Sequence, residues 1–137
     1  MSEFSTVNPA TDQKLSTYCH ADWETASDVI GKSHAAFLKW REKSHQQRAS
    51  YLLDIAKALR ENADSLAMLM TQETGKLLKD GKTEVELCAQ IFEYTAEHGA
   101  EVLADEKRSY SGGDKSAVLT YCPIGVVYSI QPWNFRV

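Results

Sequence analysis

The 137-residue sequence predicts a mostly α-helical chain with a few short strands near its N-terminus and its C-terminus. Between residues 22 and 104, apolar residues recur every three or four positions, which is typical of amphipathic helices. Two β-branched and apolar runs follow at residues 117–122 and 124–130. We therefore expect roughly 55 to 60% of the chain to be helical, well above the globular average of about a third.

Residues 1–21 are predicted to form an irregular arm that contains a short strand. Asn8, Pro9 and Asp12 favour a turn because proline fixes φ and because Asn and Asp side chains bond to the nearby backbone. Leu15 to His20 is predicted to be a strand. The helices then occupy residues 22–104, and residues 105–137 are predicted to contain the remaining strands.

Capping signals divide the helical region. Asp22 can cap a first amphipathic helix that buries one face and contains Gly31, at a cost of about 1 kcal/mol. Ser44 and Gln47 have the spacing of a capping box at the start of a second helix. That helix is predicted to end at Gly75, which suits a left-handed C-terminal cap.

The helical region has two further local features. Asn62 and the two residues after it favour a break in the second helix. A third helix is expected from about Asp80 to Ala104, and Gly99 within it suggests a close approach by another backbone.

The C-terminal part changes to strand patterns. Ala117 to Cys122 is predicted to be a strand that Pro123 ends, and residues 124–130 resemble a strand buried on both faces of a parallel sheet. Such a strand needs neighbouring strands and crossover helices, which this sequence does not supply. We expect residues 124–130 to be the opening strand of an α/β domain whose other strands are missing.

Composition and charge exclude several classes of function. The formal net charge is −4, and no Lys/Arg-rich stretch supports binding to nucleic acid. No apolar run approaches the roughly 18 to 20 residues that span a membrane, and the N-terminus has no signal sequence. Three cysteines at wide spacings predict neither a disulfide framework nor a zinc site. A cytoplasmic location fits these features best.

Few residues suggest chemistry on their own. Cys19 and His20 would point to opposite faces of a strand, which argues against a nucleophile and base pair. Cys88 is most simply a small buried hydrophobe. Asn134 follows the predicted buried strand and could donate to a developing oxyanion, because ligands bind beyond the carboxyl ends of strands in open α/β sheets. A capping Asn in a loop is the alternative.

The tail of the sequence resembles the aldehyde dehydrogenase family. The resemblance is carried by Pro123-Ile124-Gly125-Val126-Val127 and Ile130-Gln131-Pro132-Trp133-Asn134-Phe135. Earlier landmarks agree in order and spacing: Asn8-Pro9-Ala10-Thr11, Ala36-Phe37, Trp40-Arg41, Arg48 and Glu73-Thr74-Gly75-Lys76. Within the family, Glu84-Val85-Glu86, Tyr94-Thr95-Ala96-Glu97 and Leu103-Ala104-Asp105-Glu106 are most similar to succinate-semialdehyde dehydrogenases. The resemblance covers essentially the whole chain.

The resemblance implies an α/β fold and oxidation of a small-molecule aldehyde to a carboxylate. In the family, a cysteine thiolate attacks the aldehyde and hydride passes to NAD or NADP. The resemblance gives Asn134 the role of an oxyanion-hole donor. It also places Ile130, Gln131, Pro132 and Trp133 beside the cofactor.

The sequence departs from the family pattern at its end. Arg136 stands where relatives have proline, and the family's catalytic cysteine and general-base glutamate lie beyond this motif. We therefore expect residues 1–137 to be a truncated N-terminal part of a cofactor-binding domain, left by a frameshift, a premature stop or an engineered cut. It should neither turn over aldehyde nor hold NAD or NADP stably. The alternative is a non-catalytic helical module that self-associates as a homo-oligomer or pairs with a full-length relative.

Overall fold

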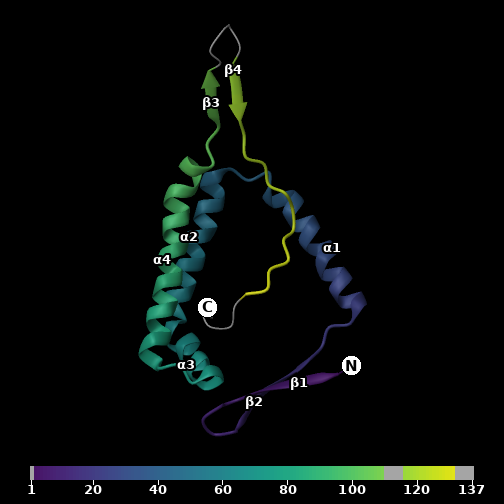
Figure 1. Ribbon diagram of the computed structural model, residues 1–137, viewed down its shortest axis with the longest axis vertical. Helices are drawn as coiled ribbons and strands as arrows, with labels where there is room; N and C mark the ends of the chain where they lie inside the picture. Colours follow the sequence, from purple (N-terminus) through teal and green to yellow (C-terminus); the bar gives the residue numbers. More distant parts are fainter. Residues whose placement is uncertain (1, 110–115, 132–137) are drawn as a thin grey trace.

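The computed structural model describes residues 2–109 and 116–131, and this part of the chain contains four helices and two β-hairpins (Figure 1). Helices make up 58% of the described residues, as predicted. In chain order the elements are β1 (Glu3–Val7), β2 (Lys14–Cys19), α1 (Trp23–Trp40), α2 (His45–Glu61), α3 (Ala63–Thr74), α4 (Leu78–Val102), β3 (Glu106–Ser109) and β4 (Ser116–Leu119).

The N-terminal arm is an antiparallel hairpin of β1 and β2. Its turn forms where the sequence predicts it: the Asn8 side chain accepts a hydrogen bond from the Ala10 amide at 2.9 Å, and Asp12 has a φ of 58°. Asn and Asp tolerate such local bonds and left-handed backbone better than most residues. The strand predicted from Leu15 is confirmed as β2, whereas its partner β1 was not predicted.

The helix caps follow the predictions. The Asp22 carboxylate accepts from the Thr25 amide at 2.8 Å, and both bonds of the Ser44 and Gln47 capping box are present. The second helical pattern divides at Asn62 into α2 and α3, and α3 ends at Gly75 with a φ of 73°. These boundaries depend on local hydrogen bonds, which is why the sequence reveals them.

The core lies where α2 and α3 pack against α4. Ala67, Met70 and Val85 form its buried cluster. A Cβ atom at Gly81 would lie 3.1 Å from both Cα and Cβ of Ala67, so glycine here allows α3 and α4 to approach closely. The prediction placed this close approach at Gly99 and was wrong, since a Cβ there meets only the Thr95 methyl group, at 3.9 Å.

Helix α1 lies apart from the other three helices (Figure 1). It contains no buried residue, and Val29 and Ile30 of its apolar stripe are 55% and 57% exposed. The expectation that this helix buries one face is therefore wrong for the described structure. The helix forms nonetheless, because its backbone hydrogen bonds are internal and Asp22 caps its first turn.

The chain beyond α4 forms a hairpin and an extended tail. Among the described strands, β3 and β4 pair only with each other, and β4 ends at Leu119, before the predicted end at Cys122. Residues 120–131, which we call the tail, have no regular structure and return toward the space between α1 and α4 (Figure 1). Residues 124–130 do not form the predicted strand, because no described strand lies beside them to complete its hydrogen bonds.

Candidate functional site

The predicted site lies at the end of the tail, and the structure describes only its first two residues. Ile130 is 83% exposed. Gln131 is also exposed, and its side-chain amide donates to the Ser129 hydroxyl at 2.5 Å. Pro132, Trp133 and Asn134 lie outside the described residues. The roles of all five therefore stay predictions.

The described part of the tail does not form a cofactor pocket. Gly125 has a φ of 127°, a value that L residues rarely adopt, and Ile124 and Tyr128 are 92% and 89% exposed. A dinucleotide site needs a concave surface with oriented backbone amides, usually at the end of a buried strand. Ile130 and Gln131 stand on an exposed, irregular segment, so these residues alone do not fit NAD or NADP.

The described cysteines lack the surroundings of an activated nucleophile. Burial raises the pKa of the Cys88 thiol above its usual value, and the Glu84 carboxylate raises it further. This thiol therefore stays protonated at neutral pH, as expected for a packing residue. The Cys19 thiol is exposed and 3.8 Å from the Glu3 carboxylate, whereas the His20 ring packs against Phe4 with centroids 5.0 Å apart. Cys19 and His20 do not form a pair.

A buried carboxylate lies one turn before Cys88 on α4. Glu84 is 5% exposed and forms an ion pair with Lys76, which follows the C-terminal cap of α3. Its Oε1 atom has no hydrogen-bond partner among the described residues. The pair joins the α3–α4 connection to α4, and the sequence does not reveal it, because charged residues are usually exposed and no local pattern joins two positions eight residues apart.

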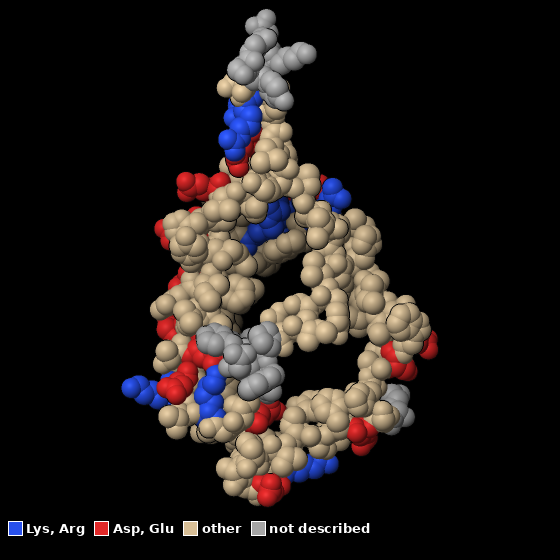
Figure 2. Space-filling view, in the orientation of Figure 1, with Lys and Arg blue, Asp and Glu red and all other residues tan. Residues whose placement is uncertain are grey.

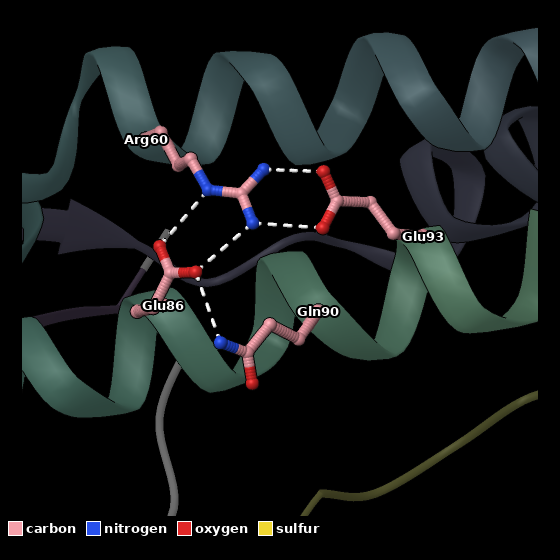
Figure 3. A network of polar contacts seen from close by, with 4 residues as sticks. All are labelled: Arg60, Glu86, Gln90 and Glu93. Atoms are coloured by element: carbon pink, nitrogen blue, oxygen red, sulfur yellow. Dashed lines mark hydrogen bonds and ion pairs between the residues drawn. The ribbon is translucent and has the colours of Figure 1, made fainter.

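An arginine clamp fixes α2 against α4 (Figure 3). The Arg60 guanidinium donates to Glu86 at 2.9 Å through Nε and Nη2, and to Glu93 at 2.5 Å and 2.8 Å. Gln90 donates to the same Glu86 carboxylate at 3.1 Å. The hydrogen bonds from Arg60 lower the pKa values of both glutamates, and the two carboxylates raise the pKa of Arg60.

Two further features limit the chemistry of the described part. No group of three or more His, Cys, Asp or Glu side chains in it could hold a metal ion. None of its helices combines the length and apolar character that a membrane crossing requires.

Comparison with known proteins identifies the family. The model of the aldehyde dehydrogenase family matches residues 1–137, and the chain belongs to that family. It is 36% identical over 132 residues to a succinate-semialdehyde dehydrogenase [NADP(+)] from Mycobacterium leprae, covering 96% of this chain and 29% of the relative. It is 35% identical over 129 residues to a succinate semialdehyde dehydrogenase [NAD(P)+] from Escherichia coli K12, covering 94% of this chain and 28% of the relative.

Solved structures share the fold of this chain. A succinic semialdehyde dehydrogenase from Streptococcus pyogenes in complex with NADP+ has a TM-score of 0.74 and 32% identity, covering 80% of this chain and 24% of that one. An indole-3-acetaldehyde dehydrogenase in apo form has a TM-score of 0.85 and 27% identity, and the match covers 96% of this chain and 30% of that one. The chain thus spans less than a third of the length of the relatives that it matches.

Proposed function

We propose that this chain is the N-terminal part of the cofactor-binding domain of an NAD(P)-dependent aldehyde dehydrogenase of the succinate-semialdehyde type. In the complete enzyme, aldehyde would be oxidised to carboxylate with NAD or NADP as hydride acceptor. Asn134 would donate to the oxyanion, and Ile130 to Trp133 would lie beside the cofactor. The proposal includes a cytoplasmic location, in keeping with three free cysteines.

The uncovered apolar tail is the observation that carries the proposal. The accessible surface is 11107 Å², whereas a compact monomer of 15.3 kDa exposes about 7,100 Å². The excess is as large as the area that obligate interfaces bury. Ile124, Tyr128 and Ile130 contribute to it, and Ile124 and Ile130 belong to the motifs that carry the family resemblance. This surface suits a domain whose other strands lie beyond the chain described.

The chain by itself should be inactive. The raised pKa of Cys88 argues against a thiolate nucleophile at that position, and Ile130 and Gln131 do not form a cofactor pocket. The test mixes the purified chain with succinic semialdehyde and NAD or NADP and records cofactor reduction. We expect no signal above buffer. Reduction that depends on this chain, and that alkylation of Cys88 abolishes, would overturn the proposal.

The same exposed surface favours a second function, a non-catalytic helical interaction module. Apolar patches of this size mark interaction sites in many soluble proteins. Size-exclusion chromatography with light scattering separates the two candidates. A stable homo-oligomer of fixed stoichiometry would favour the module, whereas polydisperse aggregate or a partly unfolded monomer would favour the truncated domain.

A further inference from the structure

The end of α1, the start of α2, the end of α4 and the first residues of the tail surround two adjoining cavities of about 230 and 240 Å³. Trp40, His45, Arg48 and Leu103 line both cavities, so the two form one space, which we call the Arg48 hollow. Figure 2 shows blue Lys and Arg side chains inside the hollow of the molecule below the β3–β4 hairpin. Ile130 and Gln131, the described residues to which the proposed function assigns roles, do not line this space.

Small residues create the apolar part of the Arg48 hollow. Ala49 on α2 lines it, together with Ala96, Gly99 and Ala100 on α4. Apart from the Thr95 methyl group at 3.9 Å, no described atom outside the local helix backbone lies within 4 Å of a Cβ built on Gly99. Leu52 and the shared Leu103 add apolar surface. The floor of the hollow therefore suits a short hydrocarbon group.

Arg48 provides a fixed cation at this floor. Its Nη1 donates to the Lys43 carbonyl at 2.7 Å, and its Nη2 lies 2.9 Å from His45 Nδ1. A guanidinium can only donate, so His45 Nδ1 accepts and its Nε2 carries the ring hydrogen. Two bonds thus hold the guanidinium in place while its remaining N–H groups are left for an acceptor.

The Arg48 guanidinium carries a positive charge in the hollow that no described carboxylate neutralises. Arg41 also lines the hollow, but its Nε lies 3.6 Å from the Glu42 carboxylate, which offsets its charge. None of the described lining residues is Asp or Glu. No described carboxylate lies within ion-pair distance of Arg48; by contrast, Arg60 on the same helix pairs with two glutamates. A held guanidinium beside an apolar floor is complementary to a ligand with a carboxylate at one end and hydrocarbon at the other.

We propose that the Arg48 hollow binds a small monocarboxylate with a short apolar body. The carboxylate accepts hydrogen bonds from Arg48, and the hydrocarbon lies against Gly99, Leu52 and Leu103. This site is independent of the proposed function, which assigns no role to α1 or α2. It requires no covalent step and no cofactor.

The test is a titration of the 137-residue chain with hexanoate and with hexanamide, followed by heteronuclear NMR. The two ligands share a hydrocarbon chain and differ in charge at one end. We expect saturable binding of hexanoate that shifts amide signals at the start of α2 and the end of α4. Hexanamide should bind about ten to a hundredfold more weakly, the loss expected for one charge-assisted hydrogen bond.

Two variants and a matched control assign the binding to this hollow. Arg48→Gln should lower the affinity for hexanoate to the affinity that the wild type has for hexanamide. Gly99→Leu should abolish binding of both ligands, because the new side chain fills the floor, and leucine keeps the helix. Lys57→Gln removes an exposed positive charge elsewhere on α2 and should leave binding unchanged; the Lys57 side chain is 75% exposed.

Several outcomes would overturn the proposal: no saturable binding of hexanoate, equal affinity for hexanoate and hexanamide, or full affinity in Gly99→Leu. If Arg48→Gln fails to fold, as judged by circular dichroism, the affinities of Gly99→Leu and Lys57→Gln for hexanoate decide whether the ligand binds in this hollow. Equal loss of affinity in Lys57→Gln and Arg48→Gln would indicate nonspecific attraction to a positive surface and would also contradict the site.

Discussion

Helix α4 and the tail both contain apolar residues, yet only α4 buries some of them. Val85 and Ala89 of α4 are fully buried, whereas Ile124 and Ile130 of the tail are 92% and 83% exposed. The difference lies in where each segment finds its hydrogen bonds. A helix satisfies its own backbone and then packs, but a strand needs a neighbour first. Helix α1 supports this explanation, because it forms while burying none of its residues.

The strongest test of this contrast removes one large side chain from the helical core that contains Val85 and one from the tail. Met70→Ala should lower the free energy of unfolding by about 2 to 5 kcal/mol, because Met70 is only 7% exposed and its loss leaves a cavity. Ile124→Ala should change it by no more than about 0.5 kcal/mol. Urea unfolding followed by circular dichroism measures both. If Ile124→Ala lowered the free energy of unfolding as much as Met70→Ala does, the tail would be shown to pack in solution.

A second test compares two glycines within helices. Gly81→Val should destabilise the chain by about 1 to 3 kcal/mol, because its Cβ would lie 3.1 Å from the Ala67 backbone. By contrast, the smaller change Gly31→Ala on α1 should stabilise the chain by about 0.5 to 1 kcal/mol, since no described atom beyond the local helix backbone lies within 4 Å of a Cβ there and alanine favours helix. Thermal unfolding compares both variants. Equal effects would show that α3 and α4 do not approach closely at Gly81.

The smallest expected effect concerns the pH dependence of the arginine clamp. Arg60 lowers the pKa values of Glu86 and Glu93, so the clamp stabilises the fold above the usual glutamate value of 4.5. That stability is lost as the pH falls below 4.5 and through the lowered values. Arg60→Gln should therefore flatten the fall of the urea midpoint between about pH 6 and pH 3.

The control for this measurement is Lys57→Gln, which removes one partner of the exposed pair with Glu61, 3.8 Å apart. It should keep the pH profile of the wild type, because exposed single pairs contribute little. An unchanged profile in Arg60→Gln would show that the clamp does not hold α2 against α4 in solution.

The sequence predicts features that depend on a few neighbouring residues. The caps at Asp22 and Ser44 and the left-handed Gly75 follow from side chains or backbone freedom within one turn. The sequence does not distinguish Gly81 from Gly99, because close approach depends on the path of a different helix. The Arg60 clamp joins residues 26 and 33 positions apart, and no local pattern indicates which carboxylates an arginine meets.

The candidate site likewise has features that the sequence predicts and features that depend on tertiary structure. The motif at residues 130–134 identifies a family from the order of side chains alone, and the family match confirms that identification. The sequence also identifies residues 124–130 as an apolar run suited to a buried strand. Tertiary structure decides whether that strand forms, because β hydrogen bonds require a second segment at the right distance.

The sequence by itself thus determined the helices, their caps and the family, since each depends on contacts within a few residues or on residue order. Only the tertiary structure decided that α2, α3 and α4 share a core while α1 and the tail stay exposed. The physical reason is that burial is a property of pairs of surfaces. An apolar face remains in contact with water until another surface covers it.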